Sequence, residues 1–318
     1  MDYNEVLETA RTKIGTKCKA CPICNGVACR NTMPGPGAKG IGDTAIRNYQ
    51  KWQEIRVNMD TICEKKQIDT GLELFGKHFS YPFFAGPVGA IAMHYSNAYS
   101  DVTYNEVLVS ACAENGIAAF TGDGLDSSVM AAATQAIKAV DGQGIPTVKP
   151  WNLETIKEKL ALVKESGAFA VAMDIDAAGL PFLQNMMPPA GSKSVSELAE
   201  IAQQAGAHAI IVSNHGGRVL DQCAATAEVL PEIAAAVDGK MRIIVDGGIR
   251  SGVDIFKALA LGADAVIIAR PFVTAVFGGG KEGVKVYIEK LAAELKDTMA
   301  MCGAFTLKEI TSEMVRRS

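Results

Sequence analysis

A histidine and an arginine that follow a run of apolar side chains have the chemistry to bind a small acid and take a proton from it. The run at residues 210–212 leads into SNHGGRVLD, which contains His215 and Arg218. Histidine is a base near neutral pH, and arginine binds a carboxylate through paired hydrogen bonds. The glycines beside His215 leave space for a ligand. This segment therefore predicts a site for a small acidic substrate.

Two further segments have the composition of a phosphate site. The sequence VDGGIR contains Gly247, Gly248 and Arg250, and Arg270 follows the next apolar run. Glycines let the backbone approach a bound group, and a helix N-terminus beside an arginine attracts phosphate. Each segment alone also fits a tight turn beside a solvated arginine. Their occurrence in tandem favours the phosphate site that α/β barrels form after strands seven and eight.

A cluster of cysteines lies in the first tenth of the chain. Two, two and four residues separate Cys18, Cys21, Cys24 and Cys29. Thiolates this close in sequence can bind an iron–sulfur cluster or zinc. The first three cysteines resemble an iron–sulfur run, but the last spacing is longer, and Arg30 follows where such a run has proline. Iron–sulfur binding, zinc binding and metal-free cysteines all stay open.

Alternating apolar and helical patterns predict the elements that position these residues. Seven apolar runs, expected as buried strands, lie at residues 81–85, 117–121, 145–149, 169–174, 208–213, 241–246 and 264–269. Between them apolar residues recur with helical spacing, as at Ile156, Leu160 and Val163. Parallel βα units near eight in number predict a closed TIM (β/α)8 barrel, with the missing unit between residues 174 and 194.

The chain divides into an extension and a barrel. Residues 1–48 form a cysteine-rich N-terminal extension that ends in a Gly/Pro-rich loop at 31–48, and residues 49–318 form the barrel. This loop is either a solvated linker or an ordered lid over the barrel mouth.

Composition excludes several classes of protein. The 318 residues are 48% hydrophobic and 21% charged, which is typical of a soluble globular protein. A net charge of −4 gives no basic field for nucleic acid, and no apolar run is long enough for a membrane span. The first residues lack the apolar run of a secretory signal, so a reducing cytoplasm is expected.

The segments SNHGGRVLD and VDGGIRSGVDIFKALALGADAVIIARPF, with the tail at residues 283–301, resemble the FMN-dependent 2-hydroxy-acid oxidase and dehydrogenase family, which includes lactate and glycolate oxidases. The resemblance implies a TIM barrel with FMN at its mouth, oxidation of a small 2-hydroxy acid to the 2-oxo acid, and a homo-oligomer of four or more subunits. It implies that His215 is the base, that Arg218 holds the substrate carboxylate, and that Asp174 orients and charges His215.

The same resemblance implies the flavin contacts. They are Pro87, Val88, Gly89, Ser213, Asp246, Gly247, Gly248, Arg250, Ala269 and Arg270. A lysine near flavin N1 stabilises the reduced anion, and Lys193 or Lys149 matches this role.

Departures from the family pattern concern the substrate. Trp151 and Met33 stand where the family has tyrosines, and residues 179–181 read Gly-Leu-Pro where it has paired arginines. Arg218, Trp151 and His215 are then the expected substrate contacts. Two alternatives stay open: a non-oxidising FMN barrel similar to type 2 isopentenyl diphosphate isomerase, and a flavin electron-transfer protein.

Overall fold

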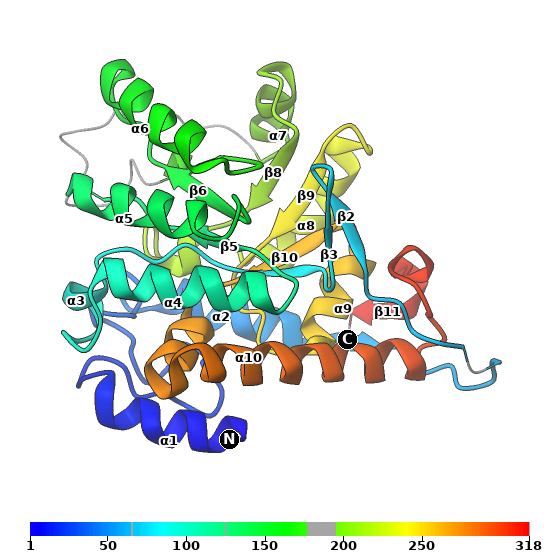
Figure 1. Ribbon diagram of the computed structural model, residues 1–318. Helices are drawn as coiled ribbons and strands as arrows, with labels where there is room; N and C mark the ends of the chain where they lie inside the picture. The colour runs from blue at the N-terminus through cyan, green and yellow to red at the C-terminus, as the bar shows by residue number, and fades with distance from the viewer. Residues whose placement is uncertain (65, 125, 177–194, 318) are drawn as a thin grey trace.

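Seven parallel strands form the centre of the molecule (Figure 1). The structure is a computed structural model that describes residues 1–64, 66–124, 126–176 and 195–317. The strands are β4 (Phe83–Ala85), β5 (Ala119–Thr121), β6 (Gly144–Val148), β7 (Ala172–Met173), β8 (Ala209–Val212), β9 (Arg242–Val245) and β10 (Ala265–Ile268). Six of them lie within a predicted apolar run, and β6 begins one residue before its predicted run at 145–149. Their side chains are largely buried on both faces, as expected of a parallel sheet covered by helices.

The order of the strands is that of a barrel. Hydrogen bonds join them in the order β7-β6-β5-β4-β10-β9-β8, so the last strand in the sequence pairs with the first. Val266 of β10 lies opposite Phe83 of β4 in parallel register. Among the described residues the sheet is open between β7 and β8. The eighth unit was predicted in this interval, and residues 177–194 lie outside the described part of the chain.

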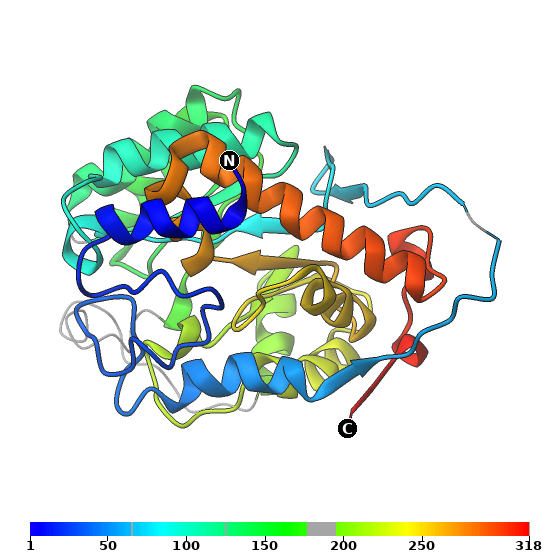
Figure 2. The ribbon, with the colours of Figure 1, turned by 90° about the horizontal axis from the view of Figure 1, so that it is seen from below.

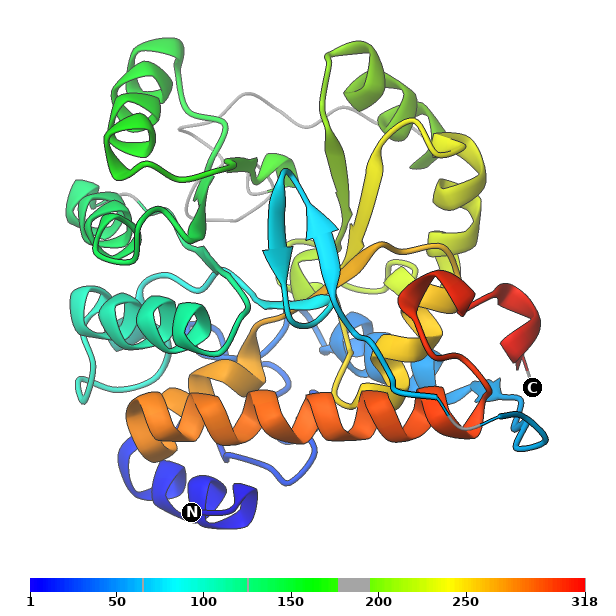
Figure 3. The same ribbon diagram turned by 45° about the vertical axis from the view of Figure 1, so that its right-hand side comes forward.

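Helices alternate with these strands and lie outside the sheet (Figures 1 and 3). They are α4 (Asp101–Glu114), α5 (Ser127–Lys138), α6 (Leu153–Ser166), α7 (Val195–Gln204), α8 (Thr226–Val237), α9 (Gly252–Ala260) and α10 (Arg270–Met301). Ser251 caps α9 by accepting a hydrogen bond from the Asp254 amide. None of the helices in the described part of the chain is long and apolar enough to cross a membrane.

Additional elements surround the barrel. Helix α1 (Tyr3–Lys13) runs along α10, and α2 (Asp43–Gln53) lies near α8 and α9 (Figure 2). Strands β1 (Ile55–Val57) and β11 (Val315–Arg317) pair with each other, as do β2 (Leu72–Leu74) and β3 (Lys77–Phe79). The short helices are α3 (Ile91–His94), η2 (His215–Gly217), η3 (Leu307–Glu309) and η4 (Ser312–Met314).

The hairpin β2–β3 packs at the amino ends of the strands. Its Phe79 ring contacts Phe84, the middle residue of β4, at a centroid distance of 4.9 Å, and Phe169, which precedes β7, at 5.7 Å. The opposite ends of the strands are left for the residues predicted to bind ligands.

The N-terminal loop is shorter than predicted. It was expected to extend to residue 48, but α2 begins at Asp43. Asn48 and Trp52 are fully buried on this helix, so tertiary packing stabilises a segment whose local composition is that of a loop. The division of the chain at residue 48 stays a prediction, and α2 runs through that position.

Candidate active site at the carboxyl ends of the strands

His215 lies between two carboxylates at the carboxyl end of the sheet. The chain turns directly after β8, and His215 opens the short helix η2 with a left-handed φ of 55°. Its Nδ1 atom is 3.0 Å from Oδ1 of Asp176 and 3.5 Å from Oδ1 of Asp174, which both follow β7. The predicted pair of His215 and Asp174 is therefore assembled from two separate strand ends. Asp176 joins it as a second acidic partner.

The carboxylates determine the charge of this histidine. Burial by itself lowers the pKa of His215, but the hydrogen bonds and negative charges of Asp174 and Asp176 outweigh it and raise the pKa to about 9. Burial raises the pKa of Asp174, yet the hydrogen bond to His215 and the charge of Lys149 hold it far below the usual range. The site thus stabilises an imidazolium ion, the form that results when histidine takes a proton from a substrate.

Lys149 contacts this group from the neighbouring strand end. Its Nζ atom lies 3.0 Å from Oδ2 of Asp174, and only a tenth of its side chain is exposed. Lys149 is therefore held beside the histidine pair, in a position from which it adds positive charge to the site. Lys193, the other lysine predicted to bind the flavin, lies outside the described residues.

Asp123 organises the side chains that follow β6. One carboxylate oxygen accepts from Nζ of the buried Lys159 at 2.6 Å. The other accepts from the Lys149 amide at 3.0 Å and from Nε1 of Trp151 at 2.7 Å. Trp151, predicted to contact substrate, is thus anchored through its ring nitrogen. Asp123 was not predicted, although a carboxylate flanked by Gly122 and Gly124 directly after a strand is the signal that identifies it.

Several buried polar atoms at these strand ends have no protein partner among the described residues. They are Oδ1 of Asp246 after β9, Nη1 of Arg270 after β10, and the hydroxyls of Thr121 and Thr147 on β5 and β6. A buried polar group without a partner costs free energy, so such groups at one end of a barrel mark a place for a polar ligand. A carboxylate suits sugar-type hydroxyls and a guanidinium suits phosphate. These residues therefore fit FMN, which has both groups.

The other predicted flavin contacts of the first and last strands lie next to one another. The Gly86 amide donates to the Ile268 carbonyl, which places the residues before Pro87, Val88 and Gly89 beside Ala269. A Cβ added to Gly86 would lie 2.8 Å from the Ala269 methyl group. Ser213 lies beside the histidine, and its hydroxyl accepts from the His215 amide at 3.0 Å.

The glycines of the VDGGIR turn pack against α2. A Cβ on Gly248 would lie 2.2 Å from the Asn48 carbonyl oxygen, and one on Gly247 would lie 3.2 Å from the Asn48 side chain. Nε1 of Trp52 donates to the Gly247 carbonyl at 2.7 Å. The predicted close approach at these glycines is therefore made by helix α2. Their role in binding a phosphate stays a prediction.

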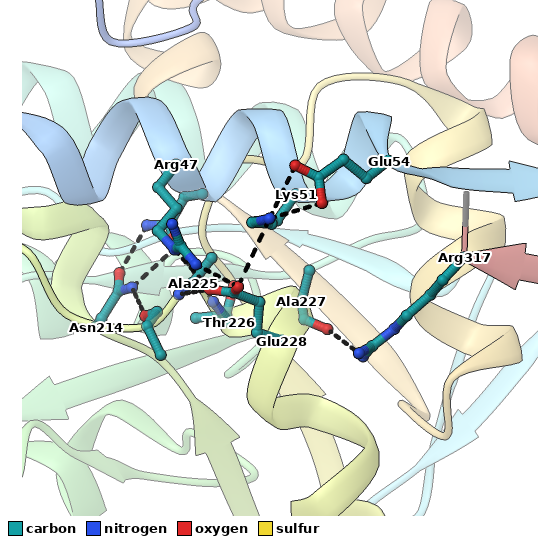
Figure 4. A network of polar contacts seen from close by, with 11 residues as sticks. Arg47, Lys51, Glu54, Asn214, Ala225, Thr226, Ala227, Glu228 and Arg317 are labelled. Atoms are coloured by element: carbon teal, nitrogen blue, oxygen red, sulfur yellow. Dashed lines mark hydrogen bonds and ion pairs between the residues drawn. The ribbon is translucent and has the colours of Figure 1, made fainter.

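A polar network on α2 also fixes the turn that carries His215 (Figure 4). The side-chain amides of Asn48 and Asn214 exchange hydrogen bonds of 2.7 and 2.9 Å. Arg47 forms two hydrogen bonds to Glu228 on α8, and Lys51 lies 3.8 Å from the same carboxylate. Asn214 directly precedes the histidine, so α2 positions the turn that carries His215. Sequence patterns did not identify this contact.

The N-terminal segment binds two of the predicted arginines. Nη1 of Arg218 donates to the carbonyl oxygens of Gly35 and Gly37, both at 2.7 Å. Nε of Arg250 donates to the Cys24 carbonyl at 2.6 Å. Residues 35–38 are buried, which favours the ordered-lid interpretation of this loop over a solvated linker. The role of Arg218 in binding a substrate carboxylate stays a prediction.

The four clustered cysteines line one cavity together with Arg270. All four are free thiols, and Cys29 is buried. Burial raises the pKa of Cys18 to about 11, and the neighbouring cysteines add to the shift. Cys63, Cys112, Cys223 and Cys302 are also free thiols and do not line this cavity.

A family model described as FMN-dependent dehydrogenase matches residues 36–186 and 194–317. Among curated proteins, a 2-hydroxyacid oxidase of Dictyostelium discoideum is 49% identical over 117 residues, which are 37% of this chain and 30% of that protein. An L-lactate oxidase of Nostoc is 43% identical over 159 residues, which are 48% of this chain and 44% of that protein. These alignments span less than half the length of the curated relatives.

Solved structures share the fold over nearly the whole chain. The flavin-binding domain of baker's yeast flavocytochrome b2 superposes with a TM-score of 0.80 at 21% identity, covering 99% of this chain and 86% of that one. A mandelate oxidase variant with (S)-mandelic acid gives a TM-score of 0.78 at 23% identity, covering 99% and 97%.

Proposed function

The chain belongs to the FMN-dependent dehydrogenase family, and on that premise we propose that it oxidises a small 2-hydroxy acid to the 2-oxo acid, with FMN as the two-electron acceptor. The observation that carries the proposal is the contact of His215, which follows β8, with two carboxylates that follow β7. Relatives named as 2-hydroxyacid and L-lactate oxidases support the class of substrate.

His215 is the proposed base. The Asp174 and Asp176 carboxylates engage its Nδ1 atom, so Nε2 is left to take a proton from the substrate. FMN, when bound, supplies the acceptor for the second hydrogen and the two electrons. The carboxylates then stabilise the imidazolium, because opposite charges within about 4 Å favour the protonated form. Lys149 offsets the negative charge on the other carboxylate oxygen of Asp174.

Substrate binding falls to Arg218 and Trp151. Two backbone carbonyls fix the Arg218 guanidinium through Nη1, so its remaining N–H groups are oriented before a carboxylate arrives. Trp151 is held by Asp123 and offers an apolar face to the substrate side chain. FMN would be held by Asp246 and Arg270, whose unpaired buried atoms suit its hydroxyls and phosphate.

An anaerobic titration of the FMN-loaded protein tests this proposal. Lactate, glycolate and longer 2-hydroxy acids are added while the flavin absorbance is measured. At least one acid is expected to bleach the flavin, and His215→Ala is expected to keep FMN but lose bleaching. Retained FMN with no bleaching by any acid would contradict the proposal, and a type 2 isopentenyl diphosphate isomerase-like reaction would then be tested.

Other features of the chain are proposed from its sequence. We propose that the barrel is closed by an eighth strand, that the enzyme is a cytoplasmic homo-oligomer of four or more subunits, and that residues 1–48 act as an extension. We also propose that Cys18, Cys21, Cys24 and Cys29 bind zinc or an iron–sulfur cluster. Their positions around one cavity support metal binding.

A further inference from the structure

The cysteine cavity adjoins the predicted phosphate-binding arginines. Cys18, Cys21, Cys24 and Cys29 come from one irregular segment between α1 and α2, and Arg270 forms part of the same cavity wall. Arg250 is joined to this segment by its hydrogen bond to the Cys24 carbonyl. The thiols therefore gather beside the end of the barrel where Asp246 and Arg270 have buried atoms with no partner among the described residues.

The segment also reaches the surface. Cys29 is buried, whereas Cys21 and Cys24 are partly exposed. Between and beside them, the side chains of Ile23 and Val27 are 52% and 46% exposed. A group bound by these thiols would thus lie between the flavin site and solvent.

The separation of the sulfurs disfavours a single zinc ion. A tetrahedral zinc ion with Zn–S bonds of about 2.3 Å holds its four sulfurs about 3.8 Å apart. Among the described residues, one group of three possible ligand atoms lies within 4.8 Å of one another, and it consists of Asp174, Asp176 and His215. No three of the four cysteine sulfurs are that close to one another. A four-iron cluster needs a wider set of thiolates, because the iron atoms stand between them.

The spacing along the chain agrees with this choice. The first two intervals, of two residues each, are those that begin a ferredoxin-type run. The third interval, of four residues, departs from that run, so the assignment of Cys29 rests on its place in the wall of the same cavity. Arg270 and Arg250 beside the cavity offset the negative charge that four thiolates and their cluster carry.

We propose that Cys18, Cys21, Cys24 and Cys29 bind a [4Fe–4S] cluster and that this cluster carries electrons from the flavin to an external one-electron acceptor protein. The second half of this inference rests on the proposed 2-hydroxy-acid oxidation. Each substrate loses two electrons and two protons in becoming the 2-oxo acid. The cluster accepts one electron at a time, so each turnover reduces two acceptor molecules, and the two protons pass to water.

Metal analysis of anaerobically purified protein tests the site without using activity. Wild-type protein is expected to contain about four iron and about four sulfide per chain, as a cubane cluster requires. Cys21→Ser and Cys24→Ser are expected to lower both at least tenfold, and unchanged FMN content reports that the barrel is folded. Cys63→Ser, which changes an exposed thiol outside the cavity, serves as the matched control and keeps the metal.

Three results would overturn the site. The first is protein without iron and sulfide, and the second is zinc at one ion per chain in place of iron. The third is loss of iron in Cys63→Ser as large as in Cys21→Ser. Cys21→Ser and Cys24→Ser are tested separately, so if one variant fails to fold, the iron content of the other still tests the site.

Electron paramagnetic resonance distinguishes the electron path from the proposed reaction. Dithionite is expected to give the signal of a reduced cluster, and a 2-hydroxy acid that bleaches the flavin is expected to give the same signal. In Cys21→Ser the acid still bleaches the flavin but gives no cluster signal. Bleaching without a cluster signal in wild-type protein would overturn the electron path alone. Absence of bleaching would overturn both the proposed oxidation and the electron path. The iron and sulfide contents would still show whether the four cysteines bind a cluster.

Discussion

The Oδ1 atom of Asp176 lies 3.0 Å from Nδ1 of His215, closer than Oδ1 of Asp174 at 3.5 Å. Two carboxylates thus share one ring nitrogen, and Asp174 is also paired with Lys149. Burial raises the pKa of Asp176, in keeping with its position beside a second acid. Asp176 therefore acts on the charge of His215 as a positioning residue.

Asp176→Asn is expected to move the pH dependence of the reaction. A base must be unprotonated to act, so kcat/KM rises with pH until His215, whose pKa is about 9, has lost its proton. The Asp176 carboxylate raises the pKa of His215, so its removal moves that pKa toward the ordinary value of 6.5. The acidic limb of the kcat/KM profile should therefore shift to lower pH. Asp176→Glu, which keeps the charge, should leave the limb near its wild-type position, and an unmoved limb in Asp176→Asn would contradict this role.

FMN binding should depend on the ionisation of Asp246. Burial raises the pKa of Asp246 to about 6, so the group is a carboxylate above that pH and a neutral acid below it. A carboxylate accepts hydrogen bonds from flavin hydroxyls more strongly than the neutral acid does, and the FMN Kd should rise as the pH falls through 6. Asp246→Asn should weaken binding by at least about tenfold, the loss of a hydrogen bond to a charged group, and should remove the pH step.

Flavin fluorescence quenching from pH 5 to 8 measures these dissociation constants. Asp264→Asn is the matched control, because Asp264 precedes β10 and pairs with Arg242 away from the flavin site. A pH step that persists in Asp246→Asn would assign the titration to another group.

Arg218→Met should weaken substrate binding and loosen the loop at residues 35–39. Loss of a charge-assisted hydrogen bond costs about 1.5–3 kcal/mol, so KM should rise about 10- to 100-fold with a smaller change in kcat. The carbonyls of Gly35 and Gly37 also lose their donor, and amide hydrogen exchange at residues 35–39 should become faster. Arg242→Met changes an exposed arginine and should alter neither quantity. Faster exchange with unchanged KM would limit Arg218 to holding the loop.

Asp123→Asn should destabilise the protein strongly. The Asp123 carboxylate is fully buried and pairs with Lys159, whose side chain is 9% exposed. Removal of one partner from a buried ion pair costs about 3–5 kcal/mol, because the other charge stays buried. Urea unfolding measures the change. Glu114→Gln breaks the exposed pair with Lys281 and should cost less than about 1 kcal/mol. Equal effects of the two variants would contradict the central role of Asp123.

Sequence patterns predicted the seven strands because parallel strands buried on both faces are continuous apolar runs between helices. They also predicted His215, Asp174 and Arg218, which lie at or just beyond strand ends. They did not identify Asp123 or Asp176 as parts of the site. The role of these two acids comes from contacts between different strand ends, up to 39 residues apart in sequence, and no local pattern records such contacts.

Helix α2 illustrates the same limit for packing. Its first six residues were assigned to a Gly/Pro-rich loop, because the segment has low helix propensity and few apolar side chains. The structure forms the helix by burying Asn48 and Trp52 against the VDGGIR turn. Gly247 and Gly248 were attributed to a ligand that needs close approach. The observed close approach is to α2, which the sequence of the turn alone did not indicate.

Gly248→Ala tests whether this packing is required. An added Cβ would lie 2.2 Å from the Asn48 carbonyl oxygen, and backbone atoms of a buried helix have little freedom to move. Gly206→Ala is the matched control: the φ angles are 81° and 79°, and no atom of the described residues lies within 4 Å of a Cβ on Gly206. Left-handed strain, about 1–2 kcal/mol, is therefore common to both variants. The clash of the new Cβ with α2 should destabilise Gly248→Ala alone by a further amount of about 1–3 kcal/mol.

The difference between the two free energies of unfolding thus isolates the contact between α2 and the VDGGIR turn. Displacement of α2 also separates Asn48 from Asn214, which directly precedes His215, so Gly248→Ala should lower kcat as well as stability. Gly206→Ala should leave kcat unchanged, because Gly206 follows α7 far from this turn. Equal losses of stability in both variants would mean that α2 moves aside freely and that the turn carrying His215 does not depend on its packing.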